Sequence, residues 1–155
     1  MLFLWGLSAA AGILAGGILT DKHGARPVIV LGLLFLALAF ASLSVSATFL
    51  SKAVAVGPAL VAIVIWRLSA WAFFPAQRTR LIGIAGIKVA PIVLSLNASF
   101  MFLGFSLGAA LGSVTLTYAA PSALGWVGSL CVGASLLLSI RTMRATAAVP
   151  EPAIA

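Results

Sequence analysis

The stretch GILTDKHGARP, from Gly17 to Pro27, places a charged turn between two long apolar runs. Residues 1–20 contain no charged side chain, and residues 28–48 contain none either. Gly24 can take a positive φ and reverse the chain tightly, and Pro27 stands at the start of the next run, where a missing backbone N–H costs little. The pattern predicts two apolar helices joined by a short charged turn.

The composition of the whole chain is that of a membrane protein. Of 155 residues, 9 are Lys or Arg and 2 are Asp or Glu, which is 7% charged, whereas ordinary soluble domains have roughly 25%. The hydrophobic fraction is 63% and the mean hydropathy is +1.27. So few polar groups could not cover a soluble protein of this size. A soluble globular domain, a disordered chain and a secreted disulfide scaffold are therefore excluded.

Charges and prolines divide the chain into five apolar segments, each near the ~20 residues that cross about 30 Å of hydrocarbon as a helix. Lipid offers no partner to backbone polar groups, so helices are expected, and the alternation typical of a membrane barrel is missing. We predict an all-α membrane protein with five transmembrane helices, at about 1–20, 28–48, 53–76, 91–118 and 121–140. They form one partial transmembrane domain, 1–144, followed by a flexible cytoplasmic tail, 145–155.

The basic residues predict the orientation. Seven of the nine fall on one side of the five spans: Lys22, Arg26, Arg78, Arg80, Lys88, Arg141 and Arg144. Lys52 falls on the other side, and Arg67 lies within a span. Because cytoplasmic loops are rich in Lys and Arg, we expect a multi-pass protein of the cell (plasma or inner) membrane with its N-terminus outside and its C-terminus in the cytoplasm. The first run is interpreted as a retained span rather than a signal peptide, because no basic residue precedes it.

The charged turn also resembles the signature loop of the major facilitator superfamily (MFS), G-x-L-x-D-[RK]-x-G-[RK]-[RK]. The matching positions are Gly17, Leu19, Asp21, Lys22, Gly24 and Arg26, and the departure is Ala25. In that family the loop is cytoplasmic, between helices 2 and 3 and again between helices 8 and 9. Residues 66–80 resemble the end of helix 10, and residues 95–110 resemble helix 11, of its drug, sugar and purine efflux carriers. The resemblance implies a C-terminal-half fragment, helices 8–12, of a carrier with about twelve helices.

The resemblance implies a secondary carrier that exports a small solute by alternating access, here truncated, with its site near the membrane midplane. Its partners would be the lipid bilayer, a small-molecule substrate and the missing N-terminal helices of the carrier. No nucleic acid is expected, because topology explains the basic charge. The alternative is a non-transporting membrane fragment or an assembly partner of a separately encoded half. A small self-assembling channel subunit is a third interpretation.

Two residues are candidates for binding a substrate. Arg67 is the charge that lies well inside a span, where it costs about 2.5–3.5 kcal/mol near the bilayer centre. It could bind an anionic group, or it could lie over Trp71 with its head drawn toward the interface. Asn97 is the second candidate, because it is the most polar uncharged side chain well within a span. It could face a central cavity, or it could form a hydrogen bond between helices.

The loop motif is the candidate for gating, through Gly17, Asp21, Lys22, Gly24 and Arg26. Asp21 stands at the C-terminal end of a helix, where the macrodipole disfavours an anion. We therefore expect it to have a partner, either one of the two cations or the N-terminus of another helix. The alternative is a solvated turn that only sets topology. Gln77, with the arginines that follow it, is expected at the cytoplasmic mouth.

Glycines at four-residue spacing are expected to pack helices closely, as in G-x-x-x-G steps in lipid. They are Gly12 and Gly16 in the first span and Gly104, Gly108 and Gly112 in the fourth. The single cysteine, Cys131, is interpreted as a packing residue. The sequence has no nucleophile–base pair, no phosphate loop and no metal-ligand cluster, so we expect no enzyme, no metal and no cofactor.

Overall fold

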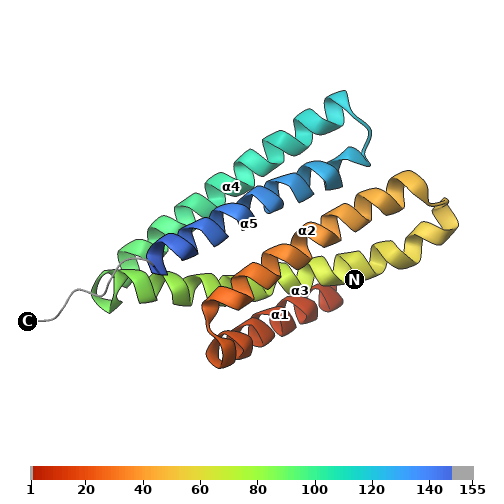
Figure 1. The fold of residues 1–155 in the computed structure, drawn as a ribbon. Helices are drawn as coiled ribbons and strands as arrows, with labels where there is room; N and C mark the ends of the chain where they lie inside the picture. The colour runs from red at the N-terminus through yellow and green to blue at the C-terminus, as the bar shows by residue number, and fades with distance from the viewer. Residues whose placement is uncertain (1, 148–155) are drawn as a thin grey trace, which may run out of the picture.

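A computed structural model describes the backbone of residues 2–147 and the side chains of residues 6–145 apart from 8, 52 and 53. Five helices make up this part of the chain (Figure 1): α1 (Leu2–His23), α2 (Ala25–Phe49), α3 (Lys52–Ala85), α4 (Ala90–Tyr118) and α5 (Ala123–Ala147). A short 3-10 turn, η1 (Ile87–Val89), joins α3 to α4. No strand occurs within residues 2–147, so the all-α prediction is confirmed.

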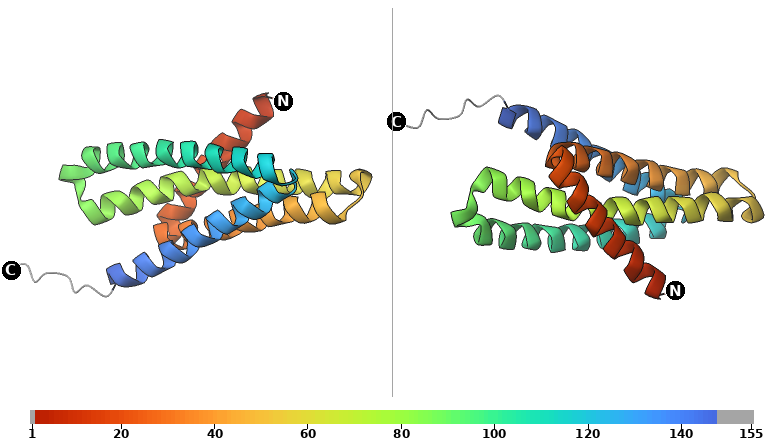
Figure 2. Two further views of the ribbon diagram at one scale, coloured as in Figure 1. Left: turned by 90° about the horizontal axis from the view of Figure 1, so that it is seen from above. Right: turned by 90° about the horizontal axis from the view of Figure 1, so that it is seen from below.

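The helices are arranged around α2 and α3, which form the most extensive interface in the bundle. α1 packs on α3, and α5 packs on α2, while α4 makes fewer contacts with α3 and α5. α2 to α5 run up and down the bundle, whereas α1 crosses them obliquely (Figure 2). α3 is therefore the helix that joins the two sides of the molecule.

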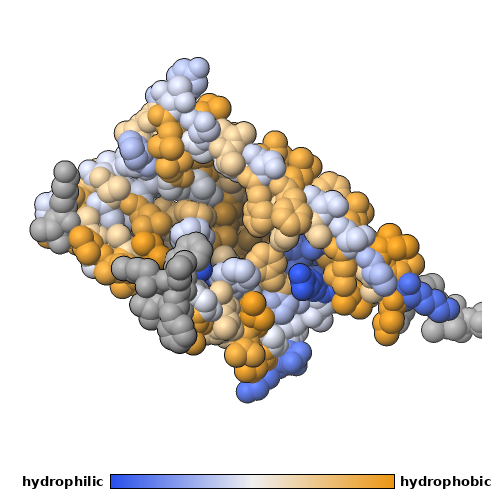
Figure 3. All heavy atoms as spheres, turned by 180° about the vertical axis from the view of Figure 1, so that it is seen from behind, coloured by the Kyte–Doolittle hydropathy of each residue, from blue (hydrophilic) through white to orange (hydrophobic). Residues whose placement is uncertain are grey.

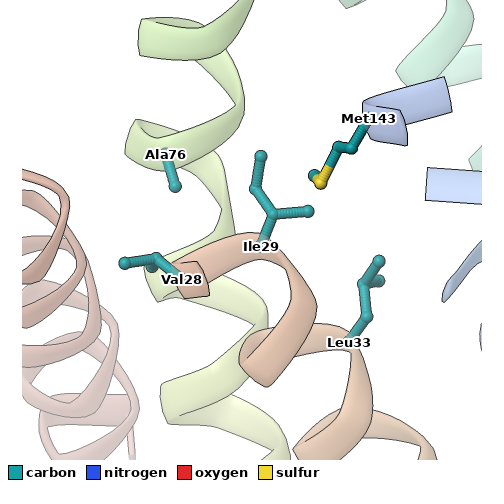
Figure 4. Close-up of a cluster of buried hydrophobic side chains, with 5 residues drawn as sticks. All are labelled: Val28, Ile29, Leu33, Ala76 and Met143. Atoms are coloured by element: carbon teal, nitrogen blue, oxygen red, sulfur yellow. The ribbon is translucent and has the colours of Figure 1, made fainter. Parts of the chain in front are cut away.

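One end of the bundle holds a small apolar core. Val28, Ile29 and Leu33 of α2 meet Ala76 of α3 and Met143 of α5 (Figure 4), and all five are buried. This contact places the start of α2, the last third of α3 and the end of α5 side by side. The seven basic residues named above belong to these segments and to the turns beside them, so they gather at this end, which we call the basic end.

The two tight turns at the basic end are made by glycines with positive φ. Gly24 has φ 82° and its N–H donates to the Thr20 carbonyl at 2.8 Å, as the sequence predicted for this turn. Gly86 has φ 81° and its N–H donates to the Ile82 carbonyl at 2.8 Å, which ends α3. L-residues rarely adopt this conformation, so both reversals depend on glycine.

The predicted third span, about 53–76, belongs to a longer helix, because α3 continues to Ala85. Pro75 lies inside the helix and does not break it, since a proline costs one backbone hydrogen bond that neighbouring groups can offset. Arg78 and Arg80 are consequently helical rather than in a loop. α5 extends to Ala147 and so includes the first residues of the predicted tail, 145–155. Residues 148–155 lie outside the described part of the chain.

Four helical segments are long and apolar enough to cross a membrane: Ala25–Phe49, Val54–Ala85, Ile87–Tyr118 and Ala123–Ala145. Four of the five predicted spans are thus supported, and the span at 1–20, which corresponds to α1, is not among them. On the face shown in Figure 3, apolar residues cover much of the surface and strongly hydrophilic residues are few. Large apolar side chains are exposed on all five helices. Soluble monomers rarely expose apolar patches of more than a few hundred Å².

Small residues bring the helices together. A Cβ added to Gly16 would overlap the backbone of Ala72 on α3, lying 2.5 Å from its Cα, and one at Gly12 would lie 2.8 Å from the Trp71 Cβ. On the other side, a Cβ added to Gly125 of α5 would lie 2.6 Å from the Phe40 carbonyl oxygen on α2. Such close approach lets dispersion contacts and interhelical hydrogen bonds hold helices together in lipid.

We predict that Gly16→Ala lowers the free energy of unfolding by about 1–3 kcal/mol, because the added methyl group collides with the α3 backbone. Gly17→Ala is the matched control, since no described atom lies within 4 Å of its added Cβ. The control is expected to leave stability unchanged or to raise it by up to about 1 kcal/mol, through the better helix propensity of alanine. Equilibrium unfolding in mixed detergent micelles measures both. Equal effects of the two variants would contradict the close approach of α1 and α3.

Candidate functional site

Arg67 lies at the middle of α3, sixteenth in a helix of 34 residues. Its side chain is only 9% exposed, although most residues around it on this helix are exposed or half-buried. One turn further, the Trp71 ring is in tilted contact with the Phe74 ring, with centroids 5.6 Å apart. A side chain that stretches toward the interface keeps its charged head in water. The burial of Arg67 therefore favours a charge held inside the bundle.

Asn97 forms a hydrogen bond between helices. The Gln77 Nε2 on α3 donates to the Asn97 Oδ1 on α4 at 3.0 Å, and both side chains are half-buried. Other polar side chains of α4, such as Ser95 and Ser99, bond to carbonyls of their own helix. The Gln77–Asn97 pair thus supplies a side-chain bond between α3 and α4, which otherwise touch sparingly.

The two substrate-binding candidates are not brought together. Gln77, which is hydrogen-bonded to Asn97, lies ten residues beyond Arg67 on the same helix. At 1.5 Å per residue this is about 15 Å along the helix axis. Arg67 therefore stands at mid-helix, whereas Asn97 and Gln77 lie toward the basic end.

Gln77 also lines a pocket of mixed polar and apolar side chains that the sequence did not reveal. This pocket, which we call the α2–α3–α5 pocket, has a volume of about 340 Å³ and includes Arg80, Ser139 and Thr142. On α3 its residues recur at positions 73, 77, 80, 81 and 84, which is one helical face. That periodicity was visible in the sequence, but the positions of α2 and α5 opposite it were not.

The loop motif surrounds the turn between α1 and α2. Asp21 and Lys22 lie in the last turn of α1, Arg26 lies in the first turn of α2, and all three side chains are exposed. Gly24 makes the reversal itself, and Gly17 lies half-buried two turns earlier. The exposure fits a solvated turn, and a partner for Asp21 stays a prediction.

The predicted packing glycines fall into two groups. Gly12 and Gly16 lie at the crossing of α1 and α3, as described above. On α4, no described atom lies within 4 Å of a Cβ built on Gly104 or Gly108, and Gly112 meets only the Leu124 side chain, at 3.8 Å. Within the described part of the chain, Gly104 and Gly108 therefore pack against no other helix. The reason is that α4 contacts α3 and α5 along other faces.

The α2–α5 interface contains small residues that were not among the predicted packing glycines. Gly128 lies against the Phe40 ring, with an added Cβ 3.3 Å from its nearest carbon. The Ser129 hydroxyl donates to the Ala37 carbonyl at 3.1 Å, and the Ser44 hydroxyl donates to the Ser122 carbonyl. The available signal was the spacing of small residues at 125, 128 and 129, which share one helical face.

The chain is similar to the uncharacterized MFS-type transporter YbcL of Bacillus subtilis (strain 168), with 27% identity over 141 residues. The match covers 90% of this chain and 34% of the relative, so the chain spans about a third of the relative's length. No family model matches the chain. No solved structure matches it either. Together with the four apolar helices, the similarity supports a multi-pass membrane protein that is a distant homologue of an MFS-type transporter.

We predict an energetic coupling of about 0.6 kcal/mol, and at most about 1.7 kcal/mol, between Gln77 and Asn97, the range measured for interhelical hydrogen bonds in membranes. The variants Gln77→Leu, Asn97→Leu and the double variant complete a double-mutant cycle of unfolding in mixed micelles. Ser99→Ala, on the same helix, is the control, because its hydroxyl bonds within α4. Strict additivity of the two substitutions would contradict the pair.

Proposed function

We propose that the chain forms part of a secondary carrier of the major facilitator type, which moves a small solute across the cell membrane by alternating access. The observation that carries the proposal is the similarity, over 90% of the chain, to an MFS-type transporter. Because the match covers 34% of that relative, the other helices of the carrier would be additional to these 155 residues. The proposal includes no enzymatic reaction, no metal and no cofactor.

The proposed topology has five spans, with α1 as the first. α1 has 22 residues, which is about 33 Å at 1.5 Å per residue and long enough for the hydrocarbon core. The gathering of seven basic residues at one end of the bundle supports a cytoplasmic basic end, with the N-terminus outside. The signature turn from Gly17 to Arg26 belongs to that end, which agrees with the cytoplasmic place of the loop in the family it resembles.

Arg67 is the proposed contact for the solute. A guanidinium buried at mid-helix suits an anionic group, because charged hydrogen bonds are strong where water is scarce. Its position at the middle of α3 agrees with a binding site near the membrane midplane. We propose an anionic or phosphate-bearing small solute and, from the resemblance of residues 66–80 to efflux carriers, export as the direction.

A second candidate function is a non-transporting fragment or an assembly partner of a separately encoded half. The observation in its favour is the same 34% coverage of the relative. In either case the lipid bilayer and further carrier helices are the proposed partners, and no nucleic acid is involved. A transport assay on membranes that contain the chain distinguishes the two functions, because only the carrier function predicts solute movement.

We predict that Arg67→Ala strongly reduces solute movement and that Arg67→Lys retains more of it, because the lysine keeps the charge but loses the fork of donors. The assay uses inverted vesicles from cells that express the chain from its own locus, with labelled nucleotides, sugar phosphates, nucleosides and sugars as probes. Arg141→Ala is the matched control, since Arg141 is exposed at the basic end.

A drop of at least about tenfold for Arg67→Ala, with unchanged membrane levels, is expected for the loss of a charged hydrogen bond. Transport at the wild-type rate in Arg67→Ala would contradict the role of Arg67. Transport of none of the probes by the wild-type vesicles, with the chain crosslinked to another membrane polypeptide, would favour the assembly partner.

We predict that alkaline phosphatase inserted after Leu50 is active and that the same enzyme fused after Arg144 is inactive, because phosphatase folds only outside the cytoplasm. Green fluorescent protein at the same two positions should give the opposite pattern. Leu50 lies in the turn between α2 and α3, away from the basic end. The reverse pattern at both positions would overturn the proposed orientation.

A further inference from the structure

The α2–α3–α5 pocket is lined by both polar and apolar side chains. Arg80 and Gln77 of α3 and Ser139 and Thr142 of α5 supply its polar side chains. The apolar side chains of the lining belong to α2 and α3 and include Phe73. The pocket lies at the basic end, beside the apolar core. A ligand that fills it must therefore have both polar and apolar parts.

The charge of the lining is positive. Arg80 is the one charged residue among the pocket's residues, and no carboxylate is among them. Asp21, the acid within the described residues, is exposed at the end of α1 and is not part of the lining. The positive charge of Arg80 is therefore not neutralised by a lining residue. Its guanidinium carries five N–H donors in a planar fork, which matches a phosphate with two parallel hydrogen bonds.

Further donors converge on the same space. Gln77 uses one N–H of its amide for Asn97, and the inventory of a primary amide leaves it a second N–H. The Thr142 hydroxyl donates to the Ser139 carbonyl at 3.0 Å, which fixes the orientation of this side chain within α5. Ser139 adds a hydroxyl that can donate to a phosphate oxygen. The polar groups thus favour an anion with several acceptor oxygens.

We propose that the α2–α3–α5 pocket binds the phosphate of an anionic phospholipid from the adjacent leaflet. Arg80 contacts the phosphate oxygens, Ser139 and Gln77 add hydrogen bonds, and the acyl chains continue along the apolar side chains. Basic pockets between transmembrane helices near the membrane surface bind lipid headgroups in this way. The site is separate from the proposed solute contact, because Arg80 lies thirteen residues beyond Arg67 on α3, or about 20 Å along the helix axis.

Arg78 is the comparison that separates the effect of the pocket on lipid binding from the effect of positive charge alone. It lies two residues before Arg80 on the same helix and at the same end, but its side chain is exposed. It borders a different pocket, on the side of α3 that faces α1 and α4, with the aromatic rings of Trp71, Phe74 and Phe105. Arg78 therefore carries the same charge at nearly the same depth, without the set of donors around Arg80.

The test compares Arg80→Gln with Arg78→Gln, which lower the net charge by the same amount. The full chain, purified in detergent, is titrated with phosphatidylglycerol, and bound lipid is counted by native mass spectrometry. Phosphatidylcholine is the zwitterionic reference. Arg80→Gln is expected to weaken phosphatidylglycerol binding about tenfold, as for the loss of a charged hydrogen bond, and Arg78→Gln about twofold or less.

Equal weakening by the two arginine variants would overturn the proposal, because it would mean diffuse attraction to the basic end. Inorganic phosphate tests the other source of the same chemistry. If millimolar phosphate displaces phosphatidylglycerol from the wild-type chain but not from Arg80→Gln, the lipid assignment is overturned and the ligand is a free phosphate. Failure of phosphate to displace the lipid would support the lipid assignment.

If Arg80→Gln does not fold, Ser139→Ala replaces it as the test variant. Its control is Ser135→Ala, one turn earlier on α5. The Ser135 hydroxyl bonds to the Cys131 carbonyl of its own helix and is exposed. Ser139→Ala is expected to weaken phosphatidylglycerol binding about threefold, as for one hydrogen bond, while the control leaves it unchanged. Equal binding by Ser139→Ala and Ser135→Ala would count against the pocket. Lipid counts require no transport, so this test is independent of the proposed carrier function.

Discussion

The close approach of helix backbones at small residues is the contact on which the rest of the structure depends. In lipid, apolar side chains gain little by leaving their solvent, so helices associate through dispersion contacts and interhelical hydrogen bonds. Gly16 lets α1 reach the Ala72 backbone of α3, and Gly125 lets α5 reach the Phe40 backbone of α2. At both contacts an added methyl group would collide with the facing backbone, so the helices would have to shift apart. The apolar core at the basic end, with five buried residues, is too small to replace them.

The first of these contacts holds α1 against α3, and α3 carries the polar groups on which the proposals rest. Arg67, Gln77 and Arg80 lie on one continuous helix, so their separation along the axis is set by the rise of 1.5 Å per residue. The helix can be continuous because Pro58 and Pro75 are accommodated within it. A break at Pro75 would have released Gln77 and Arg80 into a loop. The polar bond to α4 and the α2–α3–α5 pocket would then have no fixed geometry.

The sequence was sufficient for what depends on local composition. The apolar runs and the charged turn predicted the helices that the structure contains, and the glycine at position 24 predicted a reversal with positive φ, observed at 82°. The expected end of the third span, residue 76, lies next to Pro75, whereas Gly86, ten residues further on, is the residue that ends α3. A glycine after a helical run is the stronger signal, because it can satisfy the last carbonyls in a left-handed conformation.

What the sequence could not provide is the register between helices. The Gln77–Asn97 bond joins residues twenty positions apart, and it forms only because the η1 turn fixes how far α4 starts from the end of α3. The α2–α3–α5 pocket likewise needs Ser139 and Arg80 at the same depth, which depends on the two turns between them and on the packing of α2 against α3 and α5.

The sparse attachment of α4 follows from the same physics. Its glycines Gly104 and Gly108 meet no described atom that would resist a Cβ, so small-residue packing does not hold α4 to this chain at those positions. One interhelical hydrogen bond in a membrane is worth about 0.6 kcal/mol on average, which is about thermal energy. α4 is therefore the helix whose position within the bundle is least determined by the other four. A face with two glycines one turn apart is suited to a further helix, and this agrees with the proposal that additional carrier helices complete the bundle.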